Sequence, residues 1–253
     1  MLELEGVHGA YGEIKAVRGL DLQMGPGETV ALVGRNGAGK TTTLRLIAGV
    51  LEPTQGDVRW LGGSIVDLPP EARVEKGIVL VPEGRGMFPG LTVEENLRMG
   101  AYWRKPKPRE LKEGLDEVYG LMPRLSERRR QAAGSLSGGE QQMLAVGRGL
   151  MSDPRVLLFD EPSLGLSPAM VGSLYELLHE LKERKVAFVL VEQYVQLALE
   201  LCDKAIGLNK GEVVVSGSAA EVVASGRLTD VYMGGSELES ELEEELQELG
   251  VVG

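Results

Sequence analysis

A glycine-rich loop carries the residues of this sequence that are best suited to chemistry. An apolar run at 30–33 precedes the loop, and apolar residues recur at helical spacing over 44–48, so the loop joins a strand to a helix. Backbone N–H groups that such a loop directs inward, at the start of a helix, form a site for phosphate. Lys40 would reach the β- and γ-phosphates of a nucleotide, and the Thr41 hydroxyl would hold Mg²⁺. The loop residues are Gly34, Arg35, Asn36, Gly37, Ala38, Gly39, Lys40, Thr41 and Thr42.

An ordinary glycine-rich turn is the alternative interpretation of this loop, but the strand before it and the helix after it favour a phosphate site. A helix terminus stabilises an anion by only about 0.3–1 kcal/mol, which is too little to hold a triphosphate. Other parts of the chain must therefore supply ligands for a metal and further hydrogen-bond donors.

Two adjacent carboxylates end the apolar run 156–159. Without a cation, the negative charges of Asp160 and Glu161 would repel each other at the end of a buried strand, which favours a metal site over a structural role. We expect Asp160 to bind Mg²⁺ and Glu161 to polarise an attacking water molecule.

Two more buried strands are expected, one at 77–83 that ends at Glu83 and one at 186–191 that ends at Glu192-Gln193. Because ligands of open α/β sheets bind at the carboxyl ends of strands, Glu83 is placed where it would ligate a metal or a water molecule. A solvated glutamate at a strand end is the alternative. Tyr11 lies ahead of the glycine-rich loop, where it would either stack on a purine or pack at the end of a strand.

A second helix start is expected at Ser137-Gly138-Gly139, before apolar residues at helical spacing. Ser137 is a suitable N-cap, and the two glycines let another backbone or an anion approach closely. In isolation the pattern indicates a helix cap. Beside a phosphate-binding loop it suggests a second helix start that contacts phosphate.

Composition excludes several classes of protein. The formal net charge of −11 over 253 residues argues against a nucleic-acid-binding surface. Cys202 is the single cysteine, so there is no disulfide framework and a reducing compartment is expected. The acidic start at 1–5 does not resemble a signal peptide, and no apolar run approaches the roughly 18 residues that span a bilayer. Any membrane role must therefore come through a partner.

The remaining patterns predict an α/β chain with a helical insertion. Alternating apolar residues predict strands at 2–7 and 16–22, and the residues at 58–65 predict a short hairpin. From 92 to 140 the pattern is helical, beginning with a capping box at Thr92.

The last part of the chain is acidic and differs in composition from the rest. Its leucines at 238, 242, 246 and 249 fall at helical spacing, so an amphipathic helix docking on a neighbour is one interpretation. A solvated, partly ordered tail is the other. Seven glutamates contribute most of the net charge, at positions 237, 239, 241, 243, 244, 245 and 248.

Four elements of the sequence occur in the order found in one family: 34–42, Ser137-Gly138-Gly139, Asp160-Glu161 and 163–166. With these elements the chain resembles the nucleotide-binding subunit of ATP-binding cassette (ABC) transporters over residues 1–235. The resemblance implies one ABC ATPase domain: an α/β P-loop NTPase core of the RecA-like type with an N-terminal antiparallel β subdomain. An α-helical signature subdomain is expected as an insertion at about 91–145, and residues 236–253 as an acidic C-terminal extension.

The resemblance also implies ATP and Mg²⁺ as cofactors and a head-to-tail dimer. Each of two ATP molecules would lie between the glycine-rich loop of one subunit and Ser137-Gly138-Gly139 of a second subunit, identical or related. Tyr11 is then the residue that stacks on adenine, residues 163–166 cross the dimer seam, and the region just after Glu83 contacts transmembrane permease subunits. A solute-binding protein would act indirectly, and no nucleic-acid partner is expected. The chain would work in the cytoplasm, on the inner face of the cell membrane.

At two positions the chain departs from the commonest pattern of this family. Glu83 stands where most members have glutamine; it can still ligate Mg²⁺ or water, but it adds a negative charge. Gln193 stands where most have a histidine beside the γ-phosphate, and an amide can donate a hydrogen bond to phosphate without carrying a positive charge. We therefore assign hydrolysis chiefly to Glu161, with Gln193 and Glu83 as further candidate catalytic residues. No essential histidine ionisation near the ordinary value of about 6.5 is expected.

Within the family, the chain looks most like the LivF-type ATPase of branched-chain amino acid uptake systems. The stretches that carry this resemblance are 81–85, 136–142, 161–168 and 191–193. The predicted function is ATP hydrolysis that couples dimer closure to an importing permease. Importers of urea and short-chain amides use similar ATPases and are an alternative. A cassette that acts on ribosomes or DNA is another, although such proteins usually carry two cassettes or a long coiled-coil insertion, which this chain lacks.

Overall fold

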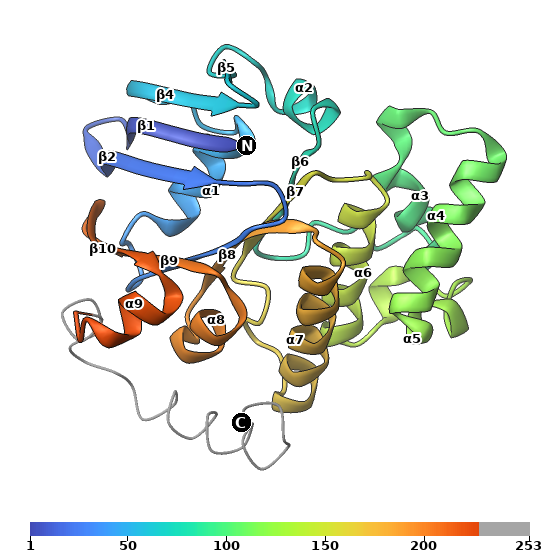
Figure 1. Ribbon diagram of the computed structural model, residues 1–253. Coiled ribbons are helices and arrows are strands. Elements are labelled where there is room, and N and C mark those ends of the chain that lie inside the picture. Colours follow the sequence, from blue (N-terminus) through green and yellow to red (C-terminus); the bar gives the residue numbers. More distant parts are fainter. Residues whose placement is uncertain (228–253) are drawn as a thin grey trace.

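The computed structural model describes residues 1–227, which form two β-sheets with helices packed around them (Figure 1). The acidic extension expected at 236–253 lies outside the described residues. No helix within 1–227 combines the length and the apolar character that crossing a bilayer requires.

The larger sheet has six strands in the order β10-β9-β3-β8-β7-β6. Its strands are parallel except β10, which pairs antiparallel with β9 at one edge. Every residue of β3, β7 and β8 is buried, as expected for central strands of a parallel sheet that is covered on both faces. The bounds are β3 Thr29–Val33, β6 Ile78–Val81, β7 Val156–Asp160, β8 Ala187–Glu192, β9 Lys204–Asn209 and β10 Glu212–Ser218.

The smaller sheet is antiparallel, with the order β2-β1-β4-β5, and it confirms the expected N-terminal strands and hairpin. Leu2 of β1 pairs with Met24 of β2 on one side and with Trp60 of β4 on the other. The register of β1 shifts at β-bulges, which interrupts the alternation of apolar and polar residues. The strands continue past these points and are therefore longer than the alternating pattern predicts. The bounds are β1 Leu2–Tyr11, β2 Ile14–Met24, β4 Gln55–Trp60 and β5 Gly63–Ser64.

Helices α3 to α6 form a group beside the larger sheet, at the right of Figure 1, while α7, α8 and α9 lie below the sheets in that view. Thr92 and Ser137 cap α3 and α6 and form capping boxes with Glu95 and Glu140, as their sequence patterns predict. The helices are α1 Lys40–Ala48, α2 Pro70–Glu75, α3 Val93–Gly100, α4 Pro108–Leu121, α5 Pro123–Glu127, α6 Gly138–Leu150, α7 Pro168–Glu183, α8 Val195–Leu201 and α9 Ala219–Ala224, with single 3-10 turns η1 Tyr102–Arg104 and η2 Ala133–Ser135.

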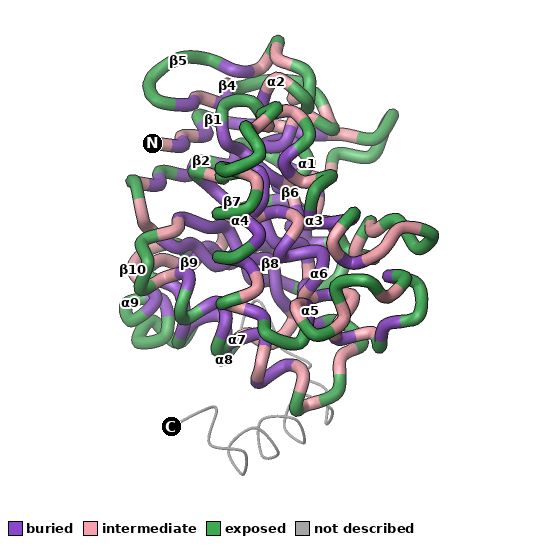
Figure 2. The backbone as a smooth tube through the Cα atoms, turned by 90° about the vertical axis from the view of Figure 1, so that its right-hand side faces the viewer, coloured by how far each residue is buried: buried purple, intermediate pink, exposed green. Residues whose placement is uncertain are grey.

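The core has two parts, one on each face of the larger sheet. Alternate residues of a strand point to opposite faces, so Leu158 and Val189 pack toward the smaller sheet and α1, while Phe159 and Phe188 pack toward α6, α7 and α8. Figure 2 shows this buried interior running through the centre of the molecule, with exposed residues at its periphery. The larger sheet is therefore a rigid base for the loops at its edges.

A buried arginine ties the glycine-rich loop's helix to the neighbouring segment. Arg73 of α2 is 1% exposed, and its guanidinium donates to the carbonyl oxygens of Leu46 and Ile47 near the end of α1 and of Val66 and Leu68. Burial lowers the pKa of Arg73. Among these acceptors, Ile47 lies in the last turn of α1, where a helix leaves its carbonyl groups without partners inside the helix.

Replacing this arginine should destabilise the fold. Arg73→Met keeps the apolar stem but removes every donor, so the buried carbonyl groups lose their partners, and the free energy of unfolding should fall by about 2–4 kcal/mol. Urea denaturation of the full chain measures the change. Arg109→Met, which alters an exposed arginine on α4, is the control and should have little effect. Equal stability of the two variants would contradict the structural role of Arg73.

Candidate functional site

The phosphate-binding loop and the candidate catalytic residues meet at one edge of the larger sheet. Strands β3, β8, β7 and β6 are parallel neighbours, so their carboxyl ends share that edge. The loop 34–42 follows β3, Glu83 follows β6, Asp160 and Glu161 end and follow β7, and Gln193 follows β8. The common edge predicted from the sequence is thus present.

Close packing explains two glycines of the loop. A Cβ at Gly34 would collide with the carbonyl oxygen of Leu208, and a Cβ at Gly39 would lie 2.5 Å from the carbonyl oxygen of Ala16. Helix α1 starts directly after Gly39, with no side-chain cap and no acidic residue in its first turn. Its first N–H groups are therefore available to an anion, as a phosphate site requires.

Thr41 and Asp160 are already paired as a metal site would need them. The Thr41 hydroxyl donates to Asp160 Oδ1 over 2.8 Å, and Asp160 is 4% exposed. A hydroxyl and a carboxylate are hard oxygen ligands, and Mg²⁺ in proteins uses one or two carboxylates together with phosphate and water. The two residues therefore fit Mg²⁺.

The environment of Asp160 also favours a cation. Burial raises the pKa of this carboxyl, the hydrogen bond from Thr41 opposes the rise, and the charges of Glu161 and Glu83 add to it. A divalent cation would neutralise this excess of negative charge and stabilise the ionised form. The charges of Glu161 and Glu83 thus act on Asp160 in the direction that the sequence predicts, although burial has the larger effect.

Glu161 lies between a lysine and an amide. Its Oε1 is 3.6 Å from Lys40 Nζ, and its Oε2 accepts a hydrogen bond of 2.6 Å from Gln193 Nε2. The backbone of Glu161 is left-handed, with φ of 48°, and its N–H donates to the carbonyl oxygen of Val191 over 2.9 Å. A strained backbone held by a neighbouring strand is typical of functional positions, and it places this carboxylate at the phosphate-binding loop.

Lys40 folds back onto its own loop. Its Nζ donates to the carbonyl oxygen of Gly34 over 2.6 Å, and the residue is only 4% exposed. The ammonium therefore lies inside the curve of the loop, near Glu161.

A cavity of about 860 Å³ opens at this edge. Three cations in its wall, Lys15, Arg18 and Lys210, were not predicted from the sequence, because the fold brings them there from turns and strands far from the loop. Positive charge around the loop favours a polyphosphate. The cavity is lined by Ile14, Lys15, Ala16, Arg18, Asn36, Gly37, Ala38, Gly39, Lys40, Thr41, Thr42, Glu83, Glu161, Leu164, Gln193 and Lys210.

Tyr11 is not among the residues that line this cavity, although it pairs with Ile14, which is. Its side chain is 42% exposed, and its hydroxyl accepts a hydrogen bond from Arg45 Nη1 over 3.1 Å. Ile14, at the start of the next strand, lines the cavity and is 71% exposed. Stacking of Tyr11 on adenine stays a prediction, and Ile14 is a second apolar surface that sequence reasoning did not single out.

The start of α6 does not line the cavity of its own chain. Ser137 Oγ accepts from the Glu140 N–H over 3.3 Å, and Glu140 pairs with Arg128 over 3.0 Å. Burial opposes ionisation of Glu140, but the hydrogen bonds from Ser137 and the charge of Arg128 lower its pKa. Ser137, Gly138 and Gly139 are therefore not part of the cavity that the phosphate-binding loop of the same chain lines.

Arg85 links the segment after Glu83 to α6. Its Nη1 donates to Gln141 Oε1 over 2.6 Å, and a Cβ added at Gly138 would lie 3.0 Å from its Nη2. Arg148 of α6 donates to the carbonyl oxygen of Gly86 over 2.6 Å. The segment after Glu83 is thus fastened to the helix that begins at Ser137, a connection that no sequence pattern indicated.

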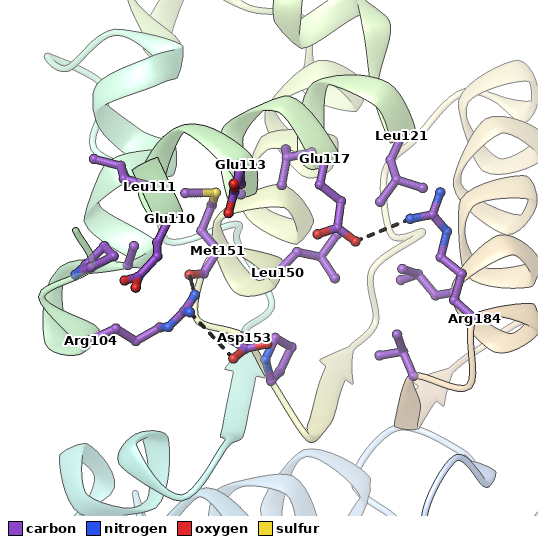
Figure 3. Close-up of a pocket in the computed structure, with 17 residues that line it drawn as sticks. Arg104, Glu110, Leu111, Glu113, Glu117, Leu121, Leu150, Met151, Asp153 and Arg184 are labelled. Carbon is purple, nitrogen blue, oxygen red and sulfur yellow. Dashed lines mark hydrogen bonds and ion pairs between the residues drawn. The ribbon is translucent and has the colours of Figure 1, made fainter. Parts of the chain in front are cut away.

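A second cavity, of about 390 Å³, lies between α4 and the core (Figure 3). Pro154 and Val186 in its wall precede β7 and β8, so this cavity is at the edge of the sheet opposite the phosphate-binding loop. Figure 3 shows ion pairs at its rim, in which Arg184 reaches Glu117 over 3.3 Å and Arg104 reaches Asp153 over 3.6 Å. These pairs join the helical group to the core and take no part in the phosphate site.

Comparison with known proteins gives one consistent family. The family model described as "ABC transporter" matches residues 17–164. The chain is 42% identical over 235 residues to BraG of Pseudomonas aeruginosa, a high-affinity branched-chain amino acid transport ATP-binding protein, covering 93% of this chain and 100% of that protein. It is 36% identical to a probable branched-chain amino acid transport ATP-binding protein, LivF, of Archaeoglobus fulgidus, covering 92% and 99%.

A solved structure agrees with these relatives. A dimeric post-hydrolysis state of the ATP-binding cassette MJ0796, bound to ADP and Pi, has a TM-score of 0.78 and 26% identity, covering 87% of this chain and 99% of that one. The predicted α/β fold class and the resemblance to ABC ATPases are therefore confirmed. The chain belongs to the ABC transporter family, and it is an ATPase of the kind that this family couples to transport.

Proposed function

We propose that this protein is the ATP-hydrolysing subunit of an importer of branched-chain amino acids and that it works in the cytoplasm, on the inner face of the cell membrane. The names of BraG and LivF and their full-length match to this chain support the solute class. The observation that carries the ATPase role is the position of Glu161, whose carboxylate lies 3.6 Å from Lys40 Nζ beside the Thr41–Asp160 pair.

Each site residue has a role in this proposal. The N–H groups of α1 and Lys40 hold the phosphates of ATP, and Thr41, Asp160 and Glu83 hold Mg²⁺, which neutralises phosphate charge when bound. Glu161 accepts a proton from the attacking water molecule. Gln193 orients Glu161 through its 2.6 Å hydrogen bond and donates to the γ-phosphate when the dimer closes. The remaining loop residues, Gly34 to Ala38 and Thr42, shape the phosphate cradle.

Two copies in head-to-tail arrangement complete the site in this proposal. One chain places Ser137 outside its own nucleotide cavity, and the relative MJ0796 forms a dimer. The start of α6 in one copy then contacts the γ-phosphate held by the other, with residues 163–166 at the seam. The second copy is either this chain or a related subunit.

An apolar groove supports docking of a permease. It has a volume of about 410 Å³, and its wall includes Phe88, Met99 and Tyr102, which are 46%, 40% and 74% exposed. A helix of a membrane subunit that lays its apolar face here would cover this surface.

Reconstitution tests the proposed solute. Membrane subunits that co-purify with the full chain are placed in lipid vesicles, and uptake of leucine and of urea is compared with and without ATP. We expect ATP-dependent uptake of leucine. Uptake of urea alone would support the amide importer, and co-purification of ribosomes or DNA without membrane subunits would support a cassette outside transport.

Removing an exposed aromatic side chain from the groove should weaken permease binding. Tyr102→Ala deletes apolar contact area in the proposed interface, so its affinity for the isolated permease should fall by about tenfold or more. Titration of labelled permease in detergent measures this affinity. Val223→Ala removes a side chain that is 51% exposed on α9, away from the groove, and serves as the matched control. Equal affinity of both variants would place the permease elsewhere.

A further inference from the structure

Glu192 is a buried carboxyl group behind the catalytic residues. It ends the central strand β8, is 1% exposed, and enters into no ion pair among residues 1–227. Its oxygens instead accept three hydrogen bonds: from Ser163 N–H over 3.1 Å, from Ser163 Oγ over 2.7 Å and from Gln193 N–H over 3.0 Å. Burying a carboxyl group without a neighbouring cation destabilises the folded state, so the position of Glu192 calls for an explanation.

The donors belong to the two segments that control Glu161. Ser163 is two residues after Glu161, at the start of the segment expected to cross the dimer seam, and it is 1% exposed. Gln193 holds Glu161 through its side-chain amide over 2.6 Å. The carboxyl group of Glu192 therefore links the segment that follows Glu161, through Ser163, to the segment that follows β8, through Gln193.

We propose that Glu192 is a positioning residue for ATP hydrolysis, whose ionised carboxylate locks Ser163 and Gln193 together and thereby fixes the Gln193 amide against Glu161. Both carboxylate oxygens are needed as acceptors, because two of the three donors are backbone N–H groups that cannot reverse direction. Only the Ser163 hydroxyl can turn round and accept. When one oxygen of Glu192 carries a hydrogen, that oxygen is a poorer acceptor, so one of the two backbone N–H groups is held less firmly.

The ionisation of Glu192 falls in the physiological range. Burial raises its pKa to about 7, the hydrogen bonds from Ser163 and Gln193 oppose the rise, and the charge of Glu161 adds to it. Burial raises the pKa of Tyr175 on α7 well above its ordinary value, and the charges of Glu192, Cys202, Tyr194 and Glu200 add to the rise. The buried hydroxyl of Tyr175 has no hydrogen-bond partner among residues 1–227. The sequence predicts no essential histidine ionisation; Glu192, a carboxyl group whose pKa burial raises to about 7, directly precedes Gln193.

Activity and stability should then change with pH in opposite directions. The ionised form of Glu192, which holds Ser163 and Gln193 together, prevails above pH 7. ATPase activity should therefore rise as the pH is raised through about 7. The native pKa lies above the ordinary value of 4.5, so the folded state holds a proton between those values that the unfolded state has lost. Stability from this group is present at low pH and is lost as pH rises through about 7.

Glu192→Gln in the full chain tests the proposal. The amide group must point its NH₂ at one of the two backbone N–H donors, so kcat should fall about ten- to hundredfold while KM for ATP stays within about threefold. The rise of activity between pH 6 and 8 should disappear, and so should the fall of melting temperature between about pH 4.5 and 7. Ser163→Ala, a smaller change that keeps the carboxylate, should lower kcat by about three- to tenfold at constant KM.

Tyr175→Phe is the matched control, since it alters the same buried region but removes a hydroxyl group that makes no hydrogen bond to the described part of the chain. It should keep the wild-type kcat and pH profile. Folded Glu192→Gln with wild-type kcat and pH profile would overturn the proposal, and so would a rise in KM equal to the fall in kcat. If Glu192→Gln does not fold, an unchanged kcat in Ser163→Ala overturns it. A pH effect lost in His8→Gln or His179→Gln, and kept in Glu192→Gln, would do the same.

Discussion

Glu161→Gln should abolish ATP hydrolysis and keep ATP binding. The amide has the shape of the carboxylate but cannot accept a proton from water, so kcat should fall by at least about a hundredfold. Lys40 keeps its 2.6 Å bond to the carbonyl oxygen of Gly34, and the start of α1 is untouched, so the phosphate cradle remains. ATP bound without hydrolysis should then hold the dimer closed.

Two measurements check this expectation. Phosphate release gives kcat, and size-exclusion chromatography with and without ATP and Mg²⁺ gives the fraction of dimer. Glu176→Gln, on the exposed side of α7, is the matched control and should hydrolyse ATP normally. Turnover at the wild-type rate in Glu161→Gln would show that another group accepts the proton.

The main chemical groups of the site were predictable because each lies in a short, contiguous sequence pattern. The strand before the glycine-rich loop, the helix after it and the carboxylates that close β7 are contiguous in sequence. Parallel strands share one carboxyl edge, so these separate patterns had to meet. Ser137 could be recognised as an N-cap because capping depends only on the next few residues.

The supporting residues could not be predicted, since their partners are distant in the chain. Ser163 and Glu192 are 29 residues apart, and Arg85 and Gln141 are 56 residues apart. A glutamate at a strand end is usually solvated, and nothing in the local sequence shows that β8 buries this one. Arg73 is similar, because its carbonyl partners on α1 are fixed only by tertiary packing.

Two variants that are inactive alone should regain activity when mixed. Lys40→Ala removes the ammonium from the phosphate cradle, and Gly138→Val places an apolar side chain at the start of α6, where the second copy's phosphate is expected. Each change spoils both sites of its own dimer. The fold should tolerate Gly138→Val, because the nearest atom to a new Cβ is the flexible end of Arg85.

The mixed dimer distinguishes a shared site from a site within one chain. In a head-to-tail dimer, the Gly138→Val chain supplies an intact cradle and the Lys40→Ala chain supplies an intact α6 start, so one of the two sites is whole. Half of the dimers in an equal mixture are of this kind, so activity should recover to at most about a quarter of wild type. The control mixes Lys40→Ala with Gly120→Val, which alters an exposed glycine of α4. It gives the ATPase rate of a mixture in which the start of α6 is unchanged in every chain. If each α6 start served its own chain, no chain in the first mixture would be whole, and the activity would stay at zero.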